Sequence, residues 1–186
     1  MAPLLHVALL RPLIPGNTGT IGRLTMATRG RLHLVGTLGF STDERACRRA
    51  GLDYWHEVDC VRWPDLEALA AALPPGSRTW AFSARASRRH TDVAYAPGDC
   101  LLFGDEARGL PDDVVAAAEA EGRALRLPLL APGVRSLNLA NAASIAVYEA
   151  LRQLGFPGEV APTGRAASGA TPTLAPTPES AACSRA

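Results

Sequence analysis

The sequence of 186 residues contains no lysine, so all 19 of its basic residues are arginines. Arginine keeps its charge in any environment and can hold a phosphate through two hydrogen bonds. A codon bias towards arginine would give the same composition, so single arginines carry little weight. Because 18 acidic residues leave a net charge of only +1, there is no overall nucleic-acid signature. Only local clusters of arginines indicate a phosphate-binding surface.

Cysteines and histidines are also few, with four of each. The four cysteines (Cys47, Cys60, Cys100 and Cys183) are too widely spaced for a Cys-x-x-Cys redox pair or a metal knuckle. No two histidines have the spacing of metal ligands. We therefore predict free thiols in a reducing compartment and no metal site.

Long apolar runs are absent, and none approaches the roughly 18 residues that span a bilayer. The first residues lack the basic and apolar regions of a secretory signal. We therefore predict a cytoplasmic protein that does not contact a membrane. With 47% hydrophobic and 20% charged residues, the chain has the composition of a globular protein with a sizeable core.

The last 30 residues differ in composition from the rest of the chain. Between residues 157 and 186, 23 residues are Pro, Ala, Thr, Ser or Gly, and large apolar residues almost vanish. Such a segment cannot bury enough apolar surface to offset the entropy lost on ordering. We therefore predict one domain over residues 1–156 and a disordered tail over residues 157–186.

Within residues 1–156, short apolar runs alternate with amphipathic stretches, which is typical of an α/β domain with a mostly parallel sheet flanked by helices. In such sheets, ligands bind beyond the carboxyl ends of the strands. The final helix has apolar residues spaced by three, four and seven, and Gly155 ends it. The predicted strands are 6–10, 32–35, 57–58, 79–82, 100–103 and 124–127. The predicted helices run from an Asn17 N-cap to about residue 28, and over 41–49, 64–73, 111–120 and 139–154.

The first loop of interest, residues 15–23, reads Pro-Gly-Asn-Thr-Gly-Thr-Ile-Gly-Arg. Gly19 and Gly22 would let a backbone or a ligand approach, and Arg23 lies six residues after the predicted cap. A plain Asn cap followed by a solvent-facing Arg explains the string equally well. The loop lacks the Gly-x-Gly-x-x-Gly order and the lysine of a phosphate loop, which argues against standard dinucleotide and ATP sites.

Two further loops carry unusual strings. Residues 103–111, Phe-Gly-Asp-Glu-Ala-Arg-Gly-Leu-Pro, place two acids and an arginine between two glycines, although an ordinary turn with a local ion pair is an alternative. Residues 128–142 deliver Ser136 and Asn138 to the start of the last helix, where Asn138 and Asn141 would share a face. A simple cap would explain Ser136 or Asn138, but not the whole string.

Together the three strings resemble the signature motifs of the SPOUT superfamily of RNA methyltransferases, and within it the branch that 2′-O-methylates the wobble nucleotide of tRNA. The matches are Asn-Thr-Gly at 17–19 with Arg23, Phe-Gly-x-Glu-x-Arg-Gly-Leu-Pro at 103–111 and Arg-Ser-x-Asn-Leu-x-Asn-Ala at 135–142. Residues 49–54 and 148–155 also resemble this branch, and the matches run in order across residues 4–156. The sequence departs from the pattern at Asp105, Ala107 and Arg29-Gly30, in a longer loop at 131–133, and in the tail.

The resemblance implies a SPOUT-type α/β fold with a C-terminal trefoil knot, a rare topology. It also implies S-adenosylmethionine as cofactor, tRNA as substrate, and a homodimer that completes each active site. Arg23 would act on the ribose hydroxyl, either as the base itself or by lowering the pKa of the hydroxyl, because a free Arg is a poor base. The implied cofactor-binding residues are Phe82, Gly104, Glu106, Leu127, Ser136, Leu137 and Asn138. Glu106 would either balance the positive sulfur of the cofactor or order its loop.

A tRNA substrate requires contacts to phosphates. Arg85, Arg88 and Arg89 with His90 form the densest basic cluster, and Arg45, Arg48 and Arg49 form another, although solvated faces would read the same way. The predicted substrate-binding residues are Asn17, Arg85, Arg88, Arg89 and Asn141. We also predict that the last helix takes part in the dimer, unless its apolar face simply packs on its own sheet.

Three other functions remain open from the sequence. The chain could methylate another tRNA or rRNA ribose, or it could be an RNA-binding relative without catalysis. The presence of Arg23, Glu106 and Asn138 argues against a relative without catalysis. A different nucleotide-using α/β enzyme is disfavoured, because the phosphate-loop and dinucleotide motifs are missing.

Overall fold

The computed structural model describes residues 2–41 and 54–160. They form a seven-stranded sheet in the order β3-β2-β1-β6-β4-β7-β5, in which all neighbouring strands are parallel. The predicted α/β class with a mostly parallel sheet is therefore confirmed. The strands are β1 (His6–Leu10), β2 (Arg31–Val35), β3 (Cys60–Trp63), β4 (Thr79–Phe82), β5 (Arg88–Arg89), β6 (Cys100–Phe103) and β7 (Ala124–Arg126). The helices are α1 (Pro15–Ala27), the 3-10 helix η1 (Trp55–Glu57), α3 (Leu66–Ala72), α4 (Asp112–Ala120) and α5 (Leu139–Leu154).

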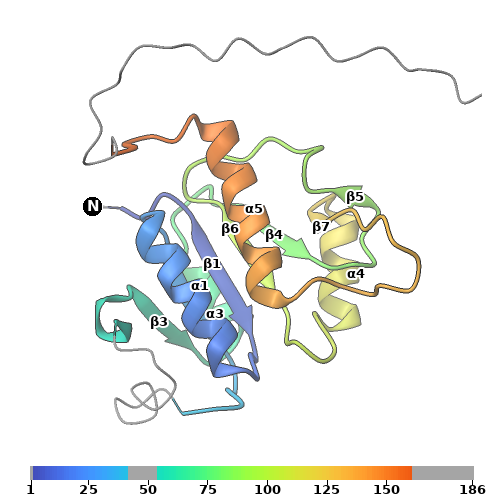
Figure 1. Ribbon diagram of the computed structural model, residues 1–186, viewed down its shortest axis with the longest axis horizontal. Helices are drawn as coiled ribbons and strands as arrows, with labels where there is room; N and C mark the ends of the chain where they lie inside the picture. Colours follow the sequence, from blue (N-terminus) through green and yellow to red (C-terminus); the bar gives the residue numbers. More distant parts are fainter. Residues whose placement is uncertain (1, 42–53, 161–186) are drawn as a thin grey trace, which may run out of the picture.

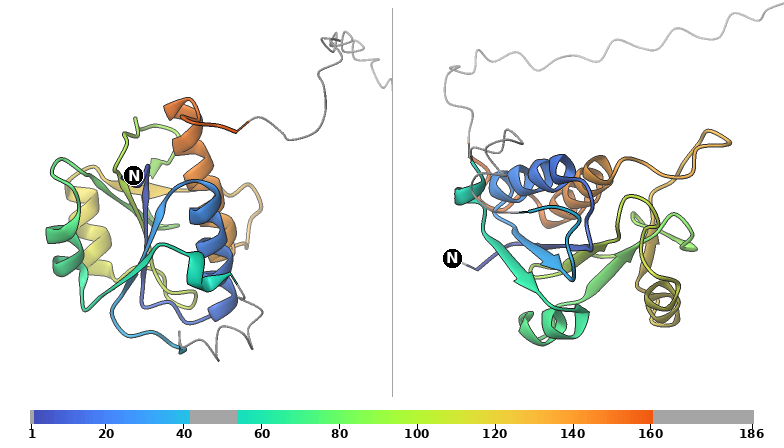
Figure 2. Two further views of the ribbon diagram at one scale, coloured as in Figure 1. Left: turned by 90° about the vertical axis from the view of Figure 1, so that its left-hand side faces the viewer. Right: turned by 90° about the horizontal axis from the view of Figure 1, so that it is seen from below.

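The sheet is the middle of three layers. Helices α1 and α5 lie side by side over one face, and α3 and α4 cover the other (Figures 1 and 2). Along β1, Val7 and Leu9 belong to the core on the α1 and α5 side, whereas Ala8 and Leu10 belong to the core on the other side. Burial on both faces explains why the central strands are continuous apolar runs rather than alternating patterns.

The chain adds strands first on one side of β1 and then on the other. The chain builds outward from β1 through β2 to β3 on one side, and then places β6, β4 and β7 on the other side of β1. In parallel sheets, this switch point opens a crevice beyond the carboxyl ends of the strands. The loops after β4, β6 and β7 therefore lie at one edge of the molecule, next to the first turn of α1.

Several predicted boundaries are confirmed and others are wrong. The strands predicted at 6–10, 79–82 and 100–103 and the helix predicted at 139–154 match the structure, and Gly155 ends α5 in the left-handed conformation at φ 72°. The strand predicted at 57–58 is wrong, because that segment enters the 3-10 helix η1 and the strand begins at Cys60. Pro64 is not the first residue of α3. Instead, Asp65 caps α3 and accepts a hydrogen bond from Ala68 N at 2.8 Å.

Strand β5 was not predicted, since two exposed arginines show no apolar pattern. The helix predicted at 41–49 and the basic cluster of Arg45, Arg48 and Arg49 lie outside the described residues, apart from Ser41. Most of the predicted tail also lies outside them. No helix in the described part of the chain is long and apolar enough to cross a membrane.

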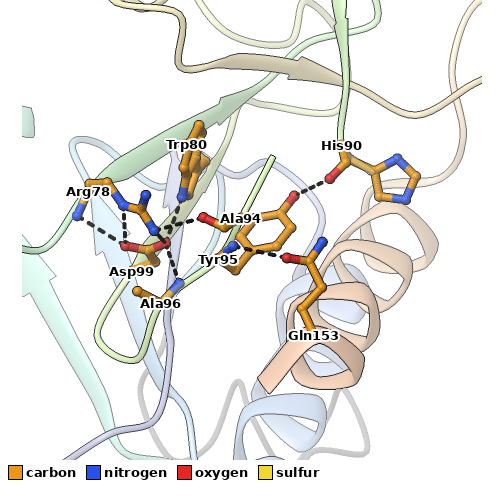
Figure 3. A network of polar contacts seen from close by, with 8 residues as sticks. All are labelled: Arg78, Trp80, His90, Ala94, Tyr95, Ala96, Asp99 and Gln153. Carbon is orange, nitrogen blue, oxygen red and sulfur yellow. Dashed lines mark hydrogen bonds and ion pairs between the residues drawn. The ribbon is translucent and has the colours of Figure 1, made fainter. Parts of the chain in front are cut away.

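A buried carboxylate joins the amino ends of β4 and β6. Asp99 is 1% exposed and accepts hydrogen bonds from Arg78 Nη2 and Trp80 Nε1, each at 2.8 Å, and from Ala96 N at 2.9 Å (Figure 3). Its charge is matched by the Arg78 guanidinium, so its burial is compensated.

The segment leading to Asp99 is tied to α5 by Tyr95. Its backbone N donates to Gln153 Oε1 at 3.0 Å, and its hydroxyl donates to the His90 carbonyl at 2.9 Å (Figure 3). The last helix is therefore held in place at the end of the sheet that lies away from the strand-following loops.

Candidate functional site

A cavity of about 800 Å³ lies at the carboxyl ends of β4, β6 and β7. Its walls come from the loops after these strands, the first turn of α1 and the start of α5. This volume lies within the roughly 300–1,000 Å³ of pockets that bind small molecules. The lining includes every predicted cofactor-binding residue: Phe82, Gly104, Glu106, Leu127, Ser136, Leu137 and Asn138.

One chain of hydrogen bonds links the three loops that the sequence singled out. Asn17 Nδ2 donates to Glu106 Oε1 at 3.0 Å, and Asn138 Nδ2 donates to Asn17 Oδ1 at 3.0 Å. These bonds join residues 89 and 121 positions apart. The three polar side chains thus fix the loops relative to one another around the cavity.

Glu106 supplies the helix cap that Asn17 was predicted to supply. The prediction of Asn17 as N-cap is wrong: α1 begins at Pro15, the Ile14 cap makes no side-chain bond, and Asn17 is buried within the first turn. The Glu106 carboxylate instead accepts from Leu13 N at 2.8 Å and Ile14 N at 3.2 Å. A carboxylate at a helix N-terminus accepts hydrogen bonds from free N–H groups, and its negative charge interacts favourably with the helix dipole. Of the two roles left open for Glu106, the geometry supports ordering of the loops.

The loop after β6 folds back tightly on itself. Asp105 pairs with Gly109 in an antiparallel bridge, and its carboxylate accepts from Ala107 N at 2.8 Å and Arg108 N at 2.6 Å. A Cβ at Gly104 would overlap the backbone of Gly109 and Leu110, so position 104 requires glycine. Asp105, which departs from the family pattern, stabilises the turn through these bonds.

Asn138 both caps α5 and faces the cavity. Its Oδ1 accepts from Ala140 N at 2.9 Å and Asn141 N at 3.3 Å, while its Nδ2 donates to Asn17. The segment before it is open, because every residue from 130 to 138 is exposed, including Ser136. The simple-cap interpretation is therefore correct for Asn138 but incomplete.

The predicted substrate-binding residues are only partly brought together. Asn17 and Arg85 line the cavity, but Arg85 Nη1 pairs with Asp112 Oδ1 at 2.6 Å. Arg88 and Arg89 form the exposed edge strand β5 and do not line the cavity. Asn141 is exposed on the first turn of α5 and is also outside the lining.

Two arginines that were not among the predicted site residues line the cavity. Arg108 and Arg135 are exposed, and neither forms an ion pair with another described residue. Each belongs to one of the motif strings, so the available signal was their membership in a strand-following loop. As cations without a counterion at a cavity, they are suited to bind an anionic ligand.

Arg23 does not reach the cavity of its own chain. It is exposed on α1, and its guanidinium lies 4.1 Å from the centroid of the Tyr54 ring. Six residues of helix place it about 9 Å along the axis from Asn17, and about 120° away around it. Its predicted role therefore requires a ribose that approaches from outside this cavity wall, or a second copy of the chain.

Comparisons with known proteins agree with this arrangement. The model of the SpoU rRNA methylase family matches residues 4–148. The chain belongs to the SpoU rRNA methylase family. This confirms the resemblance drawn from the motif strings, because the matched range contains all three of them: residues 15–23, 103–111 and 128–142.

Curated relatives and solved structures extend the family assignment. A tRNA (cytidine(34)-2′-O)-methyltransferase of Aeromonas hydrophila is 45% identical over 157 residues, which is 84% of this chain and 99% of the relative. A structure described as "Structural insights into the 2-OH methylation of C/U34 on tRNA" is 44% identical with a TM-score of 0.73, covering 82% of this chain and 97% of that one. An AdoMet-bound rRNA methyltransferase of Sinorhizobium meliloti is 28% identical with a TM-score of 0.67, covering 82% of this chain and 61% of that one.

Within residues 2–41 and 54–160, no three His, Cys, Asp or Glu side chains gather as a metal-binding group. The polar side chains around the cavity are instead amides, two serine hydroxyls, guanidinium groups and the carboxylates of Asp105 and Glu106. Such a set can bind a ligand through hydrogen bonds and charge.

Proposed function

We propose that this SpoU family member transfers a methyl group from S-adenosylmethionine to the ribose 2′-hydroxyl of the wobble nucleotide, a cytidine or a modified uridine, in the tRNA anticodon loop. The observation that carries the proposal is the hydrogen-bonded chain Glu106–Asn17–Asn138, which unites the three motif loops around one cavity. Support comes from the relatives named tRNA (cytidine(34)-2′-O)-methyltransferase, at 45% identity over nearly their whole length. A tRNA substrate would place the reaction in the cytoplasm.

The cavity fits this cofactor in size and in chemistry. It has room for a nucleoside with an amino-acid arm, and Phe82, Leu127 and Leu137 offer apolar surface to an adenine ring. Backbone at Gly104 and Ser136 would hold the adenosine, with Asn138 beside it. When bound, S-adenosylmethionine supplies a methyl group that is already activated by a positive sulfur.

The remaining chemistry belongs to the protein, which must align the acceptor oxygen and help it lose a proton. Arg23 is charged at any working pH and is therefore better suited to lower the pKa of the 2′-hydroxyl than to accept its proton. It would grip the adjacent phosphate at the same time, through the remaining donors of its guanidinium.

A homodimer would bring Arg23 to a cavity, because Arg23 lies outside the cavity of its own chain. The apolar face of α5 that includes Ala143, Val147 and Ala150 is buried within the single chain, so it does not form the interface. Exposed apolar side chains nearby do suit one: Leu13 and Ile14 before α1, and Ile145 and Tyr148 on the outer face of α5.

Two groups of arginines would bind substrate phosphates, one at the cavity and one farther away on strand β5. Arg108 and Arg135 at the cavity would bind next to the target nucleotide, with Arg85 and Asn17 in the same lining. Asn141 would contact the RNA from outside the lining, on the first turn of α5. Arg88 and Arg89 on edge strand β5 would extend the basic surface along the RNA. Contacts to phosphates would set the register of the RNA rather than read its bases.

We also propose the C-terminal knot of the SPOUT fold. It is supported by the path of the chain: the 127–138 segment leads from β7 to α5, and Tyr95 in the 84–99 segment donates to Gln153 near the end of α5. We keep the proposed domain limits at residue 156, since the last helical residue is Leu154.

The proposed activity can be tested by methyl transfer to total tRNA from a strain that lacks this protein, followed by nucleoside mapping. We expect 2′-O-methylation at the wobble position and nowhere else. Methylation of another tRNA position, or of rRNA alone, would contradict the substrate. No transfer to any RNA, with cofactor binding retained, would indicate a non-catalytic relative.

The proposed role of Arg23 gives a second test. Arg23→Ala should leave the Kd for S-adenosylmethionine within a few-fold, because Arg23 does not line the cavity, but should lower kcat by about 100-fold or more. Calorimetry and single-turnover methyl transfer measure the two quantities separately. Near-normal turnover would remove Arg23 from the mechanism.

A further inference from the structure

The turn around η1 packs unusually closely against α1. A Cβ at Gly22 would lie 3.0 Å from the Trp55 ring and 3.2 Å from Val58 Cγ2, so any larger residue would push these side chains away by a few tenths of an ångström. On the same helix, the Gly19 carbonyl accepts a hydrogen bond from the Tyr54 hydroxyl at 3.1 Å. Gly22 therefore allows the close approach of a protein segment, residues 54–58, rather than of a ligand, and the backbone carbonyl of Gly19 anchors the same segment.

This packing places the Tyr54 ring beneath Arg23. The guanidinium lies 4.1 Å from the ring centroid, and the half-buried ring is fixed at its far end by the bond to Gly19. Arg23 forms no ion pair with any described residue. An exposed arginine on a helix would otherwise sample many rotamers, and ordering it during the reaction would cost conformational entropy.

The choice of an aromatic partner suits a residue that must bind an anion. A carboxylate would neutralise the guanidinium and occupy its donors, as Asp112 does for Arg85. A ring contacts only the face of the guanidinium, so the charge and the N–H donors along its edge stay available.

We propose that Tyr54 is a positioning residue for Arg23: its ring holds the guanidinium in one orientation, and its hydroxyl anchors the ring to α1. The inference rests on the proposed function, because it assumes that Arg23 acts on the ribose and its phosphate. Holding the group before the RNA arrives would raise turnover rather than cofactor affinity.

The experiment compares Tyr54→Leu and Tyr54→Phe in the full chain, each with and without Arg23→Ala. Tyr54→Leu should lower kcat by about 5-fold to 30-fold, the range expected for loss of a cation–π contact. The Kd for S-adenosylmethionine should stay within twofold. Tyr54→Phe keeps the ring and should recover most of the turnover. In the Arg23→Ala background, Tyr54→Leu should have no further effect on kcat.

Trp55→Phe is the matched control, because it alters the packing on Gly22 in the same turn without removing the ring beneath Arg23. We expect a lower melting temperature with kcat within twofold of the unmodified protein. A second readout is independent of activity: ring currents should shift the Arg23 side-chain NMR signals upfield in the unmodified protein and in Tyr54→Phe. The shift should be absent in Tyr54→Leu.

Several outcomes would overturn the inference. A Tyr54→Phe enzyme as slow as Tyr54→Leu would show that the ring is not what matters, and equal losses with and without Arg23 would show that Tyr54 acts elsewhere. A slow Arg23→Ala enzyme beside a normal Tyr54→Leu enzyme would reject this inference alone. A normal Arg23→Ala enzyme would reject the proposed role of Arg23 as well. Should Tyr54→Leu fail to fold, Tyr54→Phe and the NMR shift still decide the question.

Discussion

The two ends of the sheet satisfy their polar groups in opposite ways. At the amino ends, Asp99 is closed in by Arg78, Trp80 and Ala96, all within 21 positions of it in sequence. At the carboxyl ends, Asn17 bonds to partners 89 and 121 positions away, and residues 130–138 before α5 are all exposed. The Asp99 cluster is therefore a local structure, whereas the hydrogen bonds at the carboxyl end form only when distant parts of the domain have folded together.

This difference separates stability from binding. Breaking a buried, fully paired charge destabilises the folded state, and such a charge offers nothing to a ligand. Arg108 and Arg135 line the cavity and form no ion pair with residues 2–41 or 54–160, so a ligand can pair with their charges. Substitutions at the amino end should therefore change the free energy of unfolding, and those at the carboxyl end should change binding and turnover as well.

The largest effect is expected at Asp99. Asp99→Ala removes the carboxylate that pairs with Arg78 and leaves Trp80 Nε1 and Ala96 N without their acceptor, so the free energy of unfolding should fall by about 3–5 kcal/mol, at about 1–3 kcal/mol for each unsatisfied group. Urea unfolding measures the change. Asp59→Ala is the control, since Asp59 pairs with Arg31 at the same 2.8 Å but both are exposed, and its loss should be below about 1 kcal/mol. Equal losses for the two variants would contradict the importance of burial.

At the carboxyl end, the corresponding test is Gly104→Ala. The added methyl group would overlap the backbone of Gly109 and Leu110, so the loop must move, at a cost of about 2–3 kcal/mol. Unlike Asp99→Ala, this variant should also lose at least about tenfold in affinity for S-adenosylmethionine, equal to about 1.4 kcal/mol. Gly16→Ala is the control, because nothing lies within 4 Å of a Cβ there. Unchanged affinity in Gly104→Ala would show that the loop is not part of the pocket.

The sequence predicted most of what short-range patterns control. Apolar runs buried on both faces located β1, β4 and β6 at their observed bounds, and the periodic α5 needed only its own residues. Strand β5 could not be predicted from the sequence, because it has only two residues, both arginines, and its backbone pairs only with β7 at the edge of the sheet. The strand predicted at 57–58 was wrong, because Glu57 ends the 3-10 helix η1 and the adjacent strand begins at Cys60, whereas the turn packs against Gly22, which is distant in sequence.

The candidate site divides in the same way. All seven predicted cofactor-binding residues line one cavity, because Phe82 ends strand β4 and the other six lie in the loops after β6 and β7. We predicted Asn17 as the cap of α1 because its residue type is typical of caps, but the acceptor for Leu13 N and Ile14 N is Glu106, 93 and 92 positions away. No local pattern encodes a partner at that distance, and the same is true of Tyr54 beneath Arg23.

A third prediction concerns pH and the buried histidines on the α3 and α4 side. Trp63 Nε1 can only donate, so His33 Nδ1 accepts at 2.8 Å, and the His33 proton lies on Nε2, facing His6 Nδ1 at 2.8 Å. The His6 proton must then lie on Nε2, which is buried without a partner. Both rings are therefore neutral in the folded protein. Burial lowers the pKa of His6, and it lowers the pKa of His33 from 6.5 to about 4.

The sign follows from these shifts. In the unfolded chain, His33 takes up a proton below about pH 6.5, whereas in the folded protein it stays neutral down to about pH 4. The free energy of unfolding should therefore fall as the pH drops from 6.5 to 4. Between pH 7 and pH 5 the loss from His33 should be about 2 kcal/mol. His33→Gln keeps an acceptor for Trp63 and should flatten the pH dependence of urea unfolding over this range. An unchanged slope in that variant would show that other groups are responsible.

The smallest effect is expected from the end of the chain. The described residues after α5 make few contacts: Phe156 packs beside Tyr148, Arg29 Nη1 reaches the Pro157 carbonyl at 3.5 Å, and Val160 is 83% exposed. A chain that ends at Gly158 keeps the first two contacts and removes a segment with almost no large apolar side chain. Its free energy of unfolding should therefore change by less than about 0.5 kcal/mol. Urea unfolding checks stability, and methyl transfer to tRNA checks function, since both ends of the sheet are left intact.

A loss of stability above 1 kcal/mol by the same urea measurement would mean that residues 159–186 pack on the domain. A loss of turnover at unchanged stability would instead assign the tail a part in binding RNA.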